Sequence, residues 1–139
     1  PICAQIKCPI QPNDTFSTLS VSLATIAATY IIPTISDYIS GLITPKKQEH
    51  SHATYTHKIS HPIYIDLTCN NRHEYNIIRA YAHEPGVFVR LKTIDLKIVD
   101  AQLIDSSIRP TIVQRPGKRA MSYDEFAHGY TGVLPFSIK

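Results

Sequence analysis

The longest uncharged stretch of the chain, Thr15 to Ser36, has the apolar spacing of an α-helix. Apolar side chains recur in it at steps of three or four residues, at Phe16, Leu19, Leu23, Ile26 and Tyr30. That step is the period of one helical face. Pro33 lacks a backbone N–H and is expected to end or kink the helix. We therefore predict a helix over about 15–31 and a short second helix near 34–43.

Most of the remaining chain alternates between apolar and polar residues, the pattern of half-buried β-strands. The segments concerned are 2–10, 53–67, about 74–82, 87–91, 94–103, 111–115 and 130–138. The apolar phase slips after Lys92, which predicts a bulge or tight turn at Lys92-Thr93. A second slip near Val99 leaves the following region as one long bent strand or two. Ser122 and Glu125 fit a capping box, which predicts a short helix near 123–128.

Together these elements predict an α+β fold. A mainly antiparallel, twisted sheet of about five to seven strands would pack against the long N-terminal helix at about 15–31. Short helices near 34–43 and 123–128 would complete it. The length of 139 residues is typical of one domain, 1–139.

The composition favours some kinds of protein and cellular location over others. Charged residues make up 18% of the chain, against about 25% in ordinary globular domains, which favours self-association or contact with a protein partner. The net charge of +3 is too small to indicate nucleic acid by itself. Three cysteines and no secretory signal favour free thiols and an intracellular location over secretion. The uncharged stretch is long enough to span a bilayer, but its many Ser and Thr residues and Pro33 favour a buried or partner-facing helix.

One segment concentrates positive charge. Between Ser106 and Ser122 there are four basic residues and no acidic one: Arg109, Arg115, Lys118 and Arg119. Prolines and a glycine keep this segment extended and turned, so the side chains could converge on phosphate groups. The segment therefore predicts an anionic partner, which could be nucleic acid, lipid head groups or an acidic protein face. A solvated loop with ordinary surface charges is the simpler alternative.

Histidines gather in the middle of the chain, at His50, His52, His57 and His61, with Cys69 and His73 following. On a strand, His57 and His61 would lie about 13 Å apart, too far to share one zinc ion. His50 and His52 could share an ion if the fold added Cys69 or His73, and a pH-sensitive interface is a further reading. Because the spacing matches no trusted zinc motif, we predict neither a metal nor a cofactor.

The first residue offers an enzymatic alternative. Pro1-Ile2-x-x-x-Ile6, a predicted strand before a predicted helix, resembles the opening of the tautomerase superfamily. In that family a free N-terminal proline acts as general base or acid, so the resemblance implies this role for Pro1. The resemblance covers about thirty residues, and the chain lacks the family's second long helix. No Gly-rich phosphate loop or nucleophile elbow is present, so no small-molecule substrate is evident.

These patterns favour a non-enzymatic structural or interaction protein. It would self-associate as a homo-oligomer and contact nucleic acid or a membrane surface through the segment 109–119. Viral matrix and capsid subunits combine an apolar sheet with a modest basic patch, which is an analogy of class only. The alternatives are a small enzyme that uses Pro1 as general base and a His/Cys metal-binding module.

Overall fold

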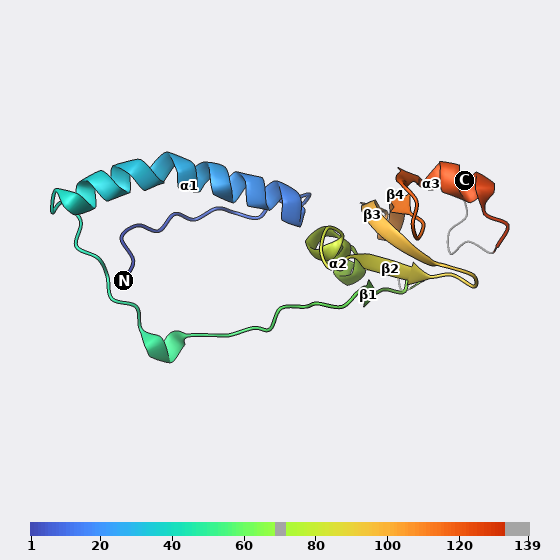
Figure 1. Cartoon of the computed structure of the whole chain (residues 1–139), viewed down its shortest axis with the longest axis horizontal. Coiled ribbons are helices and arrows are strands. Elements are labelled where there is room, and N and C mark those ends of the chain that lie inside the picture. The colour runs from blue at the N-terminus through green and yellow to red at the C-terminus, as the bar shows by residue number, and fades with distance from the viewer. Residues whose placement is uncertain (69–71, 133–139) are drawn as a thin grey trace. The chain divides into compact units, whose positions relative to one another are not determined.

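A computed structural model of the chain describes residues 1–68 and 72–132 (Figure 1). The chain divides into two units, Pro1–Lys58 (unit 1) and Ile59–Lys139 (unit 2). Among the described residues, unit 1 is built around one long helix, and unit 2 holds the sheet with two shorter helices. The expectation of a single domain over 1–139 stays a prediction.

Helix α1 of unit 1, Phe16–Ile39, is longer than predicted. A capping box closes its first turn: the Thr18 N–H donates to the Thr15 hydroxyl at 3.3 Å, and the Thr15 N–H donates to the Thr18 hydroxyl at 2.9 Å. Pro33 lies inside the helix, so the predicted helices at about 15–31 and 34–43 are one element. A proline within a helix removes one backbone hydrogen bond, and here the neighbouring turns continue the helix across the gap.

No residue of α1 is buried. Leu19 and Ile26 are half-buried. On the other side of the helix, Val21, Ile32 and Ile39 are 68%, 74% and 78% exposed. The apolar residues thus surround the helix and do not form a single stripe. The helix and the sheet belong to different units, so the prediction that the sheet packs on this helix stays a prediction.

Two predicted strands are largely absent. The segment 2–10 forms one antiparallel bridge, in which Ile2 and Lys46 exchange backbone hydrogen bonds of 2.8 and 2.9 Å. The segment 53–67 contributes only the two-residue strand β1, Ile63–Tyr64, and the 3-10 helix η1, His50–His52, precedes it. Alternation gives a segment an apolar face, but a strand also needs a neighbour that satisfies its backbone groups.

Unit 2 contains a five-stranded mixed sheet in the order β1-β2-β3-β4-β5. Beside β1 its strands are β2 (Val87–Arg90), β3 (Asp95–Ile104), β4 (Ser107–Gln114) and β5 (Ala120–Ser122). β1 runs parallel to β2, and the other neighbours are antiparallel. The predicted strand at 130–138 falls mainly on residues 133–139, outside the described part of the chain.

The turns between the strands follow local sequence signals. β2 and β3 are joined by a tight turn at Lys92-Thr93, as predicted, closed by a 2.9 Å bond from the Leu91 N–H to the Ile94 carbonyl. The second phase slip is also confirmed, because β3 is one strand whose register with β4 shifts on both sides of Asp100.

Two helices complete the core of unit 2. Helix α2, Arg72–Tyr81, contacts β2 and β3, and helix α3, Tyr123–Gly129, contacts β4 and β5. The predicted strand at about 74–82 is therefore wrong: the buried residues Tyr75 and Ile78 are three apart, which is a helical step. The predicted helix near 123–128 is confirmed, with the Glu125 N–H donating to the Ser122 hydroxyl at 3.1 Å.

The core lies between the sheet and these helices. Its most fully buried large side chains are Leu67, Val87, Ile98, Ile108 and Val113. The predicted α+β class is confirmed. The finer description is only partly right, since the five-stranded sheet is mixed and its helical partners are α2 and α3.

Candidate nucleic-acid interface

Three of the four predicted cations lie on the hairpin that joins β4 to β5. Its turn runs from Arg115 to Lys118, and the Lys118 N–H donates to the Arg115 carbonyl at 3.1 Å. Pro116 and Gly117 occupy the central positions, and the φ of Gly117 is +66°, as a type II turn requires. The side-chain amide of Gln114 donates to the Lys118 carbonyl at 2.8 Å. The local sequence thus forms a turn that is fixed by two hydrogen bonds. The three basic residues on it, Arg115, Lys118 and Arg119, are called the hairpin cluster below.

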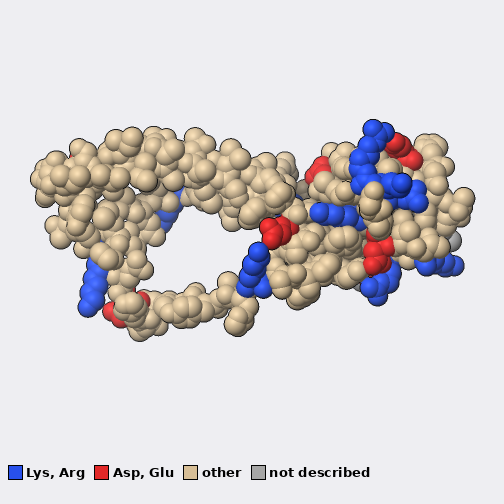
Figure 2. Space-filling model, viewed as in Figure 1, with Lys and Arg blue, Asp and Glu red and all other residues tan. Residues whose placement is uncertain are grey.

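The hairpin cluster faces solvent. Arg115 and Lys118 are exposed, and neither forms an ion pair with any residue in the described ranges 1–68 and 72–132. Arg119 lies 4.0 Å from the Glu125 carboxylate, with the two side chains 87% and 56% exposed. Such a pair is weak and screened by salt, so Arg119 stays available to another anion. Figure 2 shows basic side chains gathered over β4 and the start of α3.

The fourth cation, Arg109, is separate. It lies inside β4 opposite Gln102 of β3, near the turn Asp105-Ser106 at the far end of the strand. The six residue steps from Arg109 to Arg115 correspond to about 20 Å at the usual strand rise. The segment 109–119 is therefore a strand and a hairpin, and not a single loop.

A second group lies on the outer face of the sheet, across β1, β2 and β3. The Tyr64 hydroxyl donates to the Asp95 carboxylate at 2.7 Å, and Nε of Arg90 lies 3.5 Å from the same carboxylate. The Arg90 guanidinium carbon sits 4.5 Å from the centre of the Tyr64 ring. Phe88 lies beside Tyr64, with 5.9 Å between ring centres. These four residues are called the aromatic–arginine group below.

The neighbours of Arg90 favour its charged form. Its hydrogen bond with Tyr64 and the negative charge of Asp95 raise the pKa of Arg90 above its usual value. The sequence did not reveal this group, because Tyr64 and Asp95 are 31 positions apart. The one available signal was the alternation of 87–91, which puts Phe88 and Arg90 on the same face.

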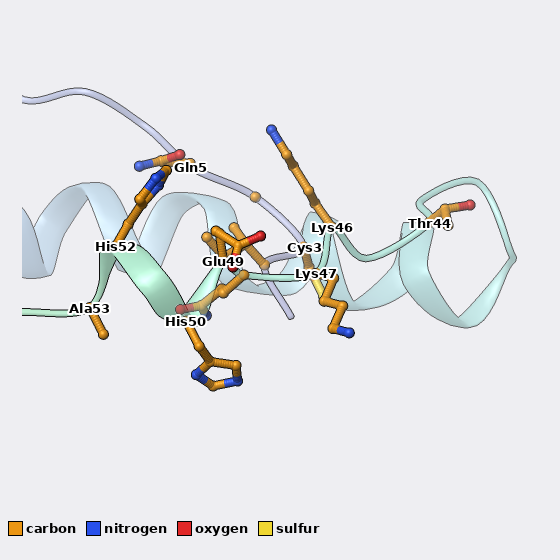
Figure 3. A pocket seen from close by; sticks show the side chains of 12 residues that line it. Cys3, Gln5, Thr44, Lys46, Lys47, Glu49, His50, His52 and Ala53 are labelled. Atoms are coloured by element: carbon orange, nitrogen blue, oxygen red, sulfur yellow. The ribbon is translucent and has the colours of Figure 1, made fainter.

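The structure divides the candidate metal ligands between the units. His50 and His52 lie in η1 of unit 1, His73 lies in α2 of unit 2, and Cys69 lies outside the described residues. Figure 3 shows the side chains of His50 and His52 extending in opposite directions. Within residues 1–68 and 72–132, no group of three or more His, Cys, Asp or Glu side chains is placed to hold a metal ion.

Unit 1 has an open hollow of about 820 Å³ between its N-terminal segment and the segment 44–53. Gln5 and His52 both line it, whereas Lys46 and Lys47 extend in different directions (Figure 3). Its labelled polar groups do not converge on one point, so the hollow presents no obvious site for a single small ligand. Pro1 is exposed next to the Ile2–Lys46 bridge, and the strand that would position it as a catalytic base is absent.

Comparison with known proteins gives a consistent name. The chain is similar to methionyl-tRNA formyltransferases. It is 34% identical over 107 residues to the enzyme of Kosmotoga olearia, covering 76% of the chain and 34% of that protein. It is 33% identical over 105 residues to that of Roseiflexus sp., covering 75% of the chain and 32% of the relative. With the Thermotoga maritima enzyme it shares 26% identity over 153 residues, covering 93% of the chain and 49% of the relative.

No protein-family model matches the chain. The chain spans a third to a half of the length of these curated relatives. Their names correct the predicted function: a non-enzymatic, self-assembling structural subunit of viral matrix or capsid type conflicts with similarity to an enzyme. The analogy failed because a low charge fraction and an apolar sheet are equally typical of part of a larger enzyme.

Proposed function

We propose that the chain is part of a methionyl-tRNA formyltransferase, and that unit 2 contacts the tRNA through the hairpin cluster. The observation that carries the proposal is the 34% identity to the Kosmotoga olearia enzyme over 76% of the chain. Because the chain spans only part of its relatives, formyl transfer itself is proposed for the whole enzyme and not for this chain alone.

The chemistry of the hairpin cluster fits the substrate in the relatives' name. A tRNA is a polyanion, and Lys and Arg side chains bind its phosphates with release of counterions. Arg115 and Lys118 are exposed and free of ion pairs with the described residues, so binding a phosphate would break no existing pair. The turn is fixed by two hydrogen bonds at Lys118, which lowers the cost of ordering these long side chains on binding.

The rest of the enzyme would also explain α1. This helix is long and apolar enough to cross a membrane by length and composition, a test that a core helix of a soluble protein also passes. The match to the Thermotoga maritima enzyme covers 93% of the chain, which leaves too few residues outside it to omit α1. A helix that is apolar on all sides is normally buried in a larger core. The proposal is that the part of the enzyme outside this chain packs on α1 and covers Val21, Ile32 and Ile39.

Formyl transfer by the full-length enzyme that contains this chain tests the proposal. The variant Arg115→Gln, Lys118→Gln, Arg119→Gln is expected to raise KM for methionyl-tRNA about tenfold at 0.1 M salt and leave kcat nearly unchanged, because phosphate contacts contribute uniform binding. The matched control, Lys7→Gln, Lys46→Gln, Lys47→Gln, removes the same charge from unit 1 and should change KM little.

Two results would count against the proposal. An unmodified full-length enzyme without formyl transfer to methionyl-tRNA would remove the proposed activity. Equal effects of the two triple variants on KM would leave the activity in place and reject the hairpin cluster as the tRNA contact.

A further inference from the structure

The aromatic–arginine group presents a planar cation to solvent. The Arg90 side chain is 72% exposed, although it is held on one side by the Asp95 carboxylate and lies over the Tyr64 ring. The guanidinium thus lies close to an aromatic ring, with its carbon 4.5 Å from the ring centre, while most of the side chain stays open to solvent. Holding the plane in this way removes much of the entropy that a free arginine loses when it stacks on a ligand.

Two further cations come from the neighbouring strand and turn. Lys97 of β3 is in register with Phe88, which is in register with Tyr64, so the three side chains form one row across the outer face of the sheet. Lys92 lies exposed in the adjacent turn between β2 and β3. Arg90 and Lys97 lie on this face and Lys92 lies in the adjacent turn, while Asp95 is the one acidic residue of the group. The local charge is complementary to a phosphate-bearing ligand.

We propose that this face binds an unpaired RNA nucleotide, whose base stacks on the Arg90 guanidinium while Lys92 or Lys97 contacts an adjacent phosphate. Arginine planes and aromatic rings are the usual platforms for bases splayed out of single-stranded RNA. Bases within a duplex are already stacked on their neighbours and do not reach such a platform. The inference rests on the proposed function, because it specifies how unit 2 would recognise a single-stranded part of the tRNA in addition to the phosphate backbone.

A purely structural role would leave part of this arrangement unexplained. The bond from Tyr64 to Asp95 ties β1 to β3 across β2, and it does so without Arg90. Arg90 adds a positively charged guanidinium that is open to solvent and lies next to the Tyr64 ring. Tyr64 is itself 46% exposed. The combination of an ordered guanidinium, an aromatic backing and flanking lysines is what a stacking site requires.

The test compares single-stranded and duplex RNA as probes of the chain. Arg90→Lys keeps the charge but removes the plane. It is expected to weaken binding of a short single-stranded oligoribonucleotide by at least about fivefold and to leave binding of an RNA duplex unchanged. A 2-aminopurine base in the single strand should report the loss of stacking by its fluorescence. Arg79→Lys is the matched control, because Arg79 also lies over a tyrosine ring, at 5.7 Å from the centre of Tyr75.

The outcomes separate this inference from the proposed function. Unchanged single-strand binding in Arg90→Lys, or equal losses for single strand and duplex, overturns the stacking site while any effect of the hairpin cluster on tRNA still stands. Failure of the unmodified chain to bind any RNA overturns both the stacking site and the hairpin cluster as an RNA contact, and it leaves formyl transfer by the full-length enzyme to its own assay. If Arg90→Lys unfolds the chain, Tyr64→Leu keeps an apolar side chain and removes the ring beside Arg90. It should also weaken single-strand binding, and no change would overturn the site.

Discussion

Units 1 and 2 use apolar residues in opposite ways. In unit 2 the apolar positions converge, and Val87, Ile98 and Val113 are fully buried between the sheet and two short helices. In unit 1 the longest helix of the described residues buries none of its side chains, and Ile32 and Ile39 are about three-quarters exposed. Figure 2 shows the same contrast in charge, since the visible surface of α1 is almost free of charged side chains.

An apolar pattern therefore specifies a buried face but not the partner that buries it. Unit 2 supplies its own partner, because α2 packs on β2 and β3 and α3 packs on β4 and β5. The partner proposed for α1 lies in the part of the enzyme beyond this chain. The two units should therefore respond differently to the same kind of substitution.

The largest difference between the two units is expected in the unfolding free energy that is lost when an isoleucine is replaced by alanine. Ile98→Ala should lower the free energy of unfolding by about 2 to 5 kcal/mol, because it leaves a cavity at a fully buried site. Ile39→Ala in the 139-residue chain should change it by less than about 0.5 kcal/mol, because Ile39 is 78% exposed. Urea unfolding followed by circular dichroism measures both. Similar losses in the two variants would show that α1 is already buried in the isolated chain.

A substitution with a smaller expected effect tests the proposal that the rest of the enzyme buries α1. Ile32→Thr keeps the β-branched shape and a similar helix propensity, so it should be nearly neutral in the 139-residue chain. In the full-length enzyme the same substitution would bury a hydroxyl and cost about 2 kcal/mol of unfolding free energy. Thermal and urea unfolding of the two proteins compare these values. A neutral result in both would contradict burial of α1 by the rest of the enzyme.

Local sequence signals predicted parts of unit 2 well. The turn at Lys92-Thr93, the register shift around Asp100 and the capped helix after Ser122 depend on neighbouring residues, and the structure has all three. Helix α2 was missed because its short apolar run fits both a strand and a helix. In unit 1, Pro33 did not end α1, and alternation at 2–10 could not show that no partner strand exists among the described residues.

The two candidate sites also differ in how far the sequence predicts them. Arg115, Lys118 and Arg119 were predicted as a cluster because they are close in sequence, and the proline–glycine turn keeps them close in space. The sequence also groups Arg109 with them, but Arg109 lies within β4, whereas the turn that holds the cluster begins at Arg115. The aromatic–arginine group depends on contacts between three strands, which no spacing in one sequence reveals.

The smallest expected effect concerns two tyrosines. Burial, and secondly the charge of Asp124, raise the pKa of Tyr123 above its ordinary value of about 10. The stability linked to this shift is fully present below the unfolded-state pKa and is lost as pH rises through the folded-state pKa. The melting temperature should therefore fall more steeply above about pH 10 in the unmodified chain than in Tyr123→Phe. Tyr55→Phe is the control, since Tyr55 is 94% exposed, and a control slope matching that of Tyr123→Phe would contradict the assignment.

Recognition of tRNA by the hairpin cluster is tested most sharply by the salt dependence of tRNA binding to the 139-residue chain. We expect log Kd to rise linearly with log salt concentration. Neutralising Arg115, Lys118 and Arg119 should lower this slope by about one for each phosphate that these side chains no longer neutralise. Neutralising Lys7, Lys46 and Lys47 of unit 1 should leave the slope nearly unchanged. A chain that does not bind tRNA at low salt, or whose slope falls equally in both variants, would contradict tRNA recognition by the hairpin cluster of unit 2.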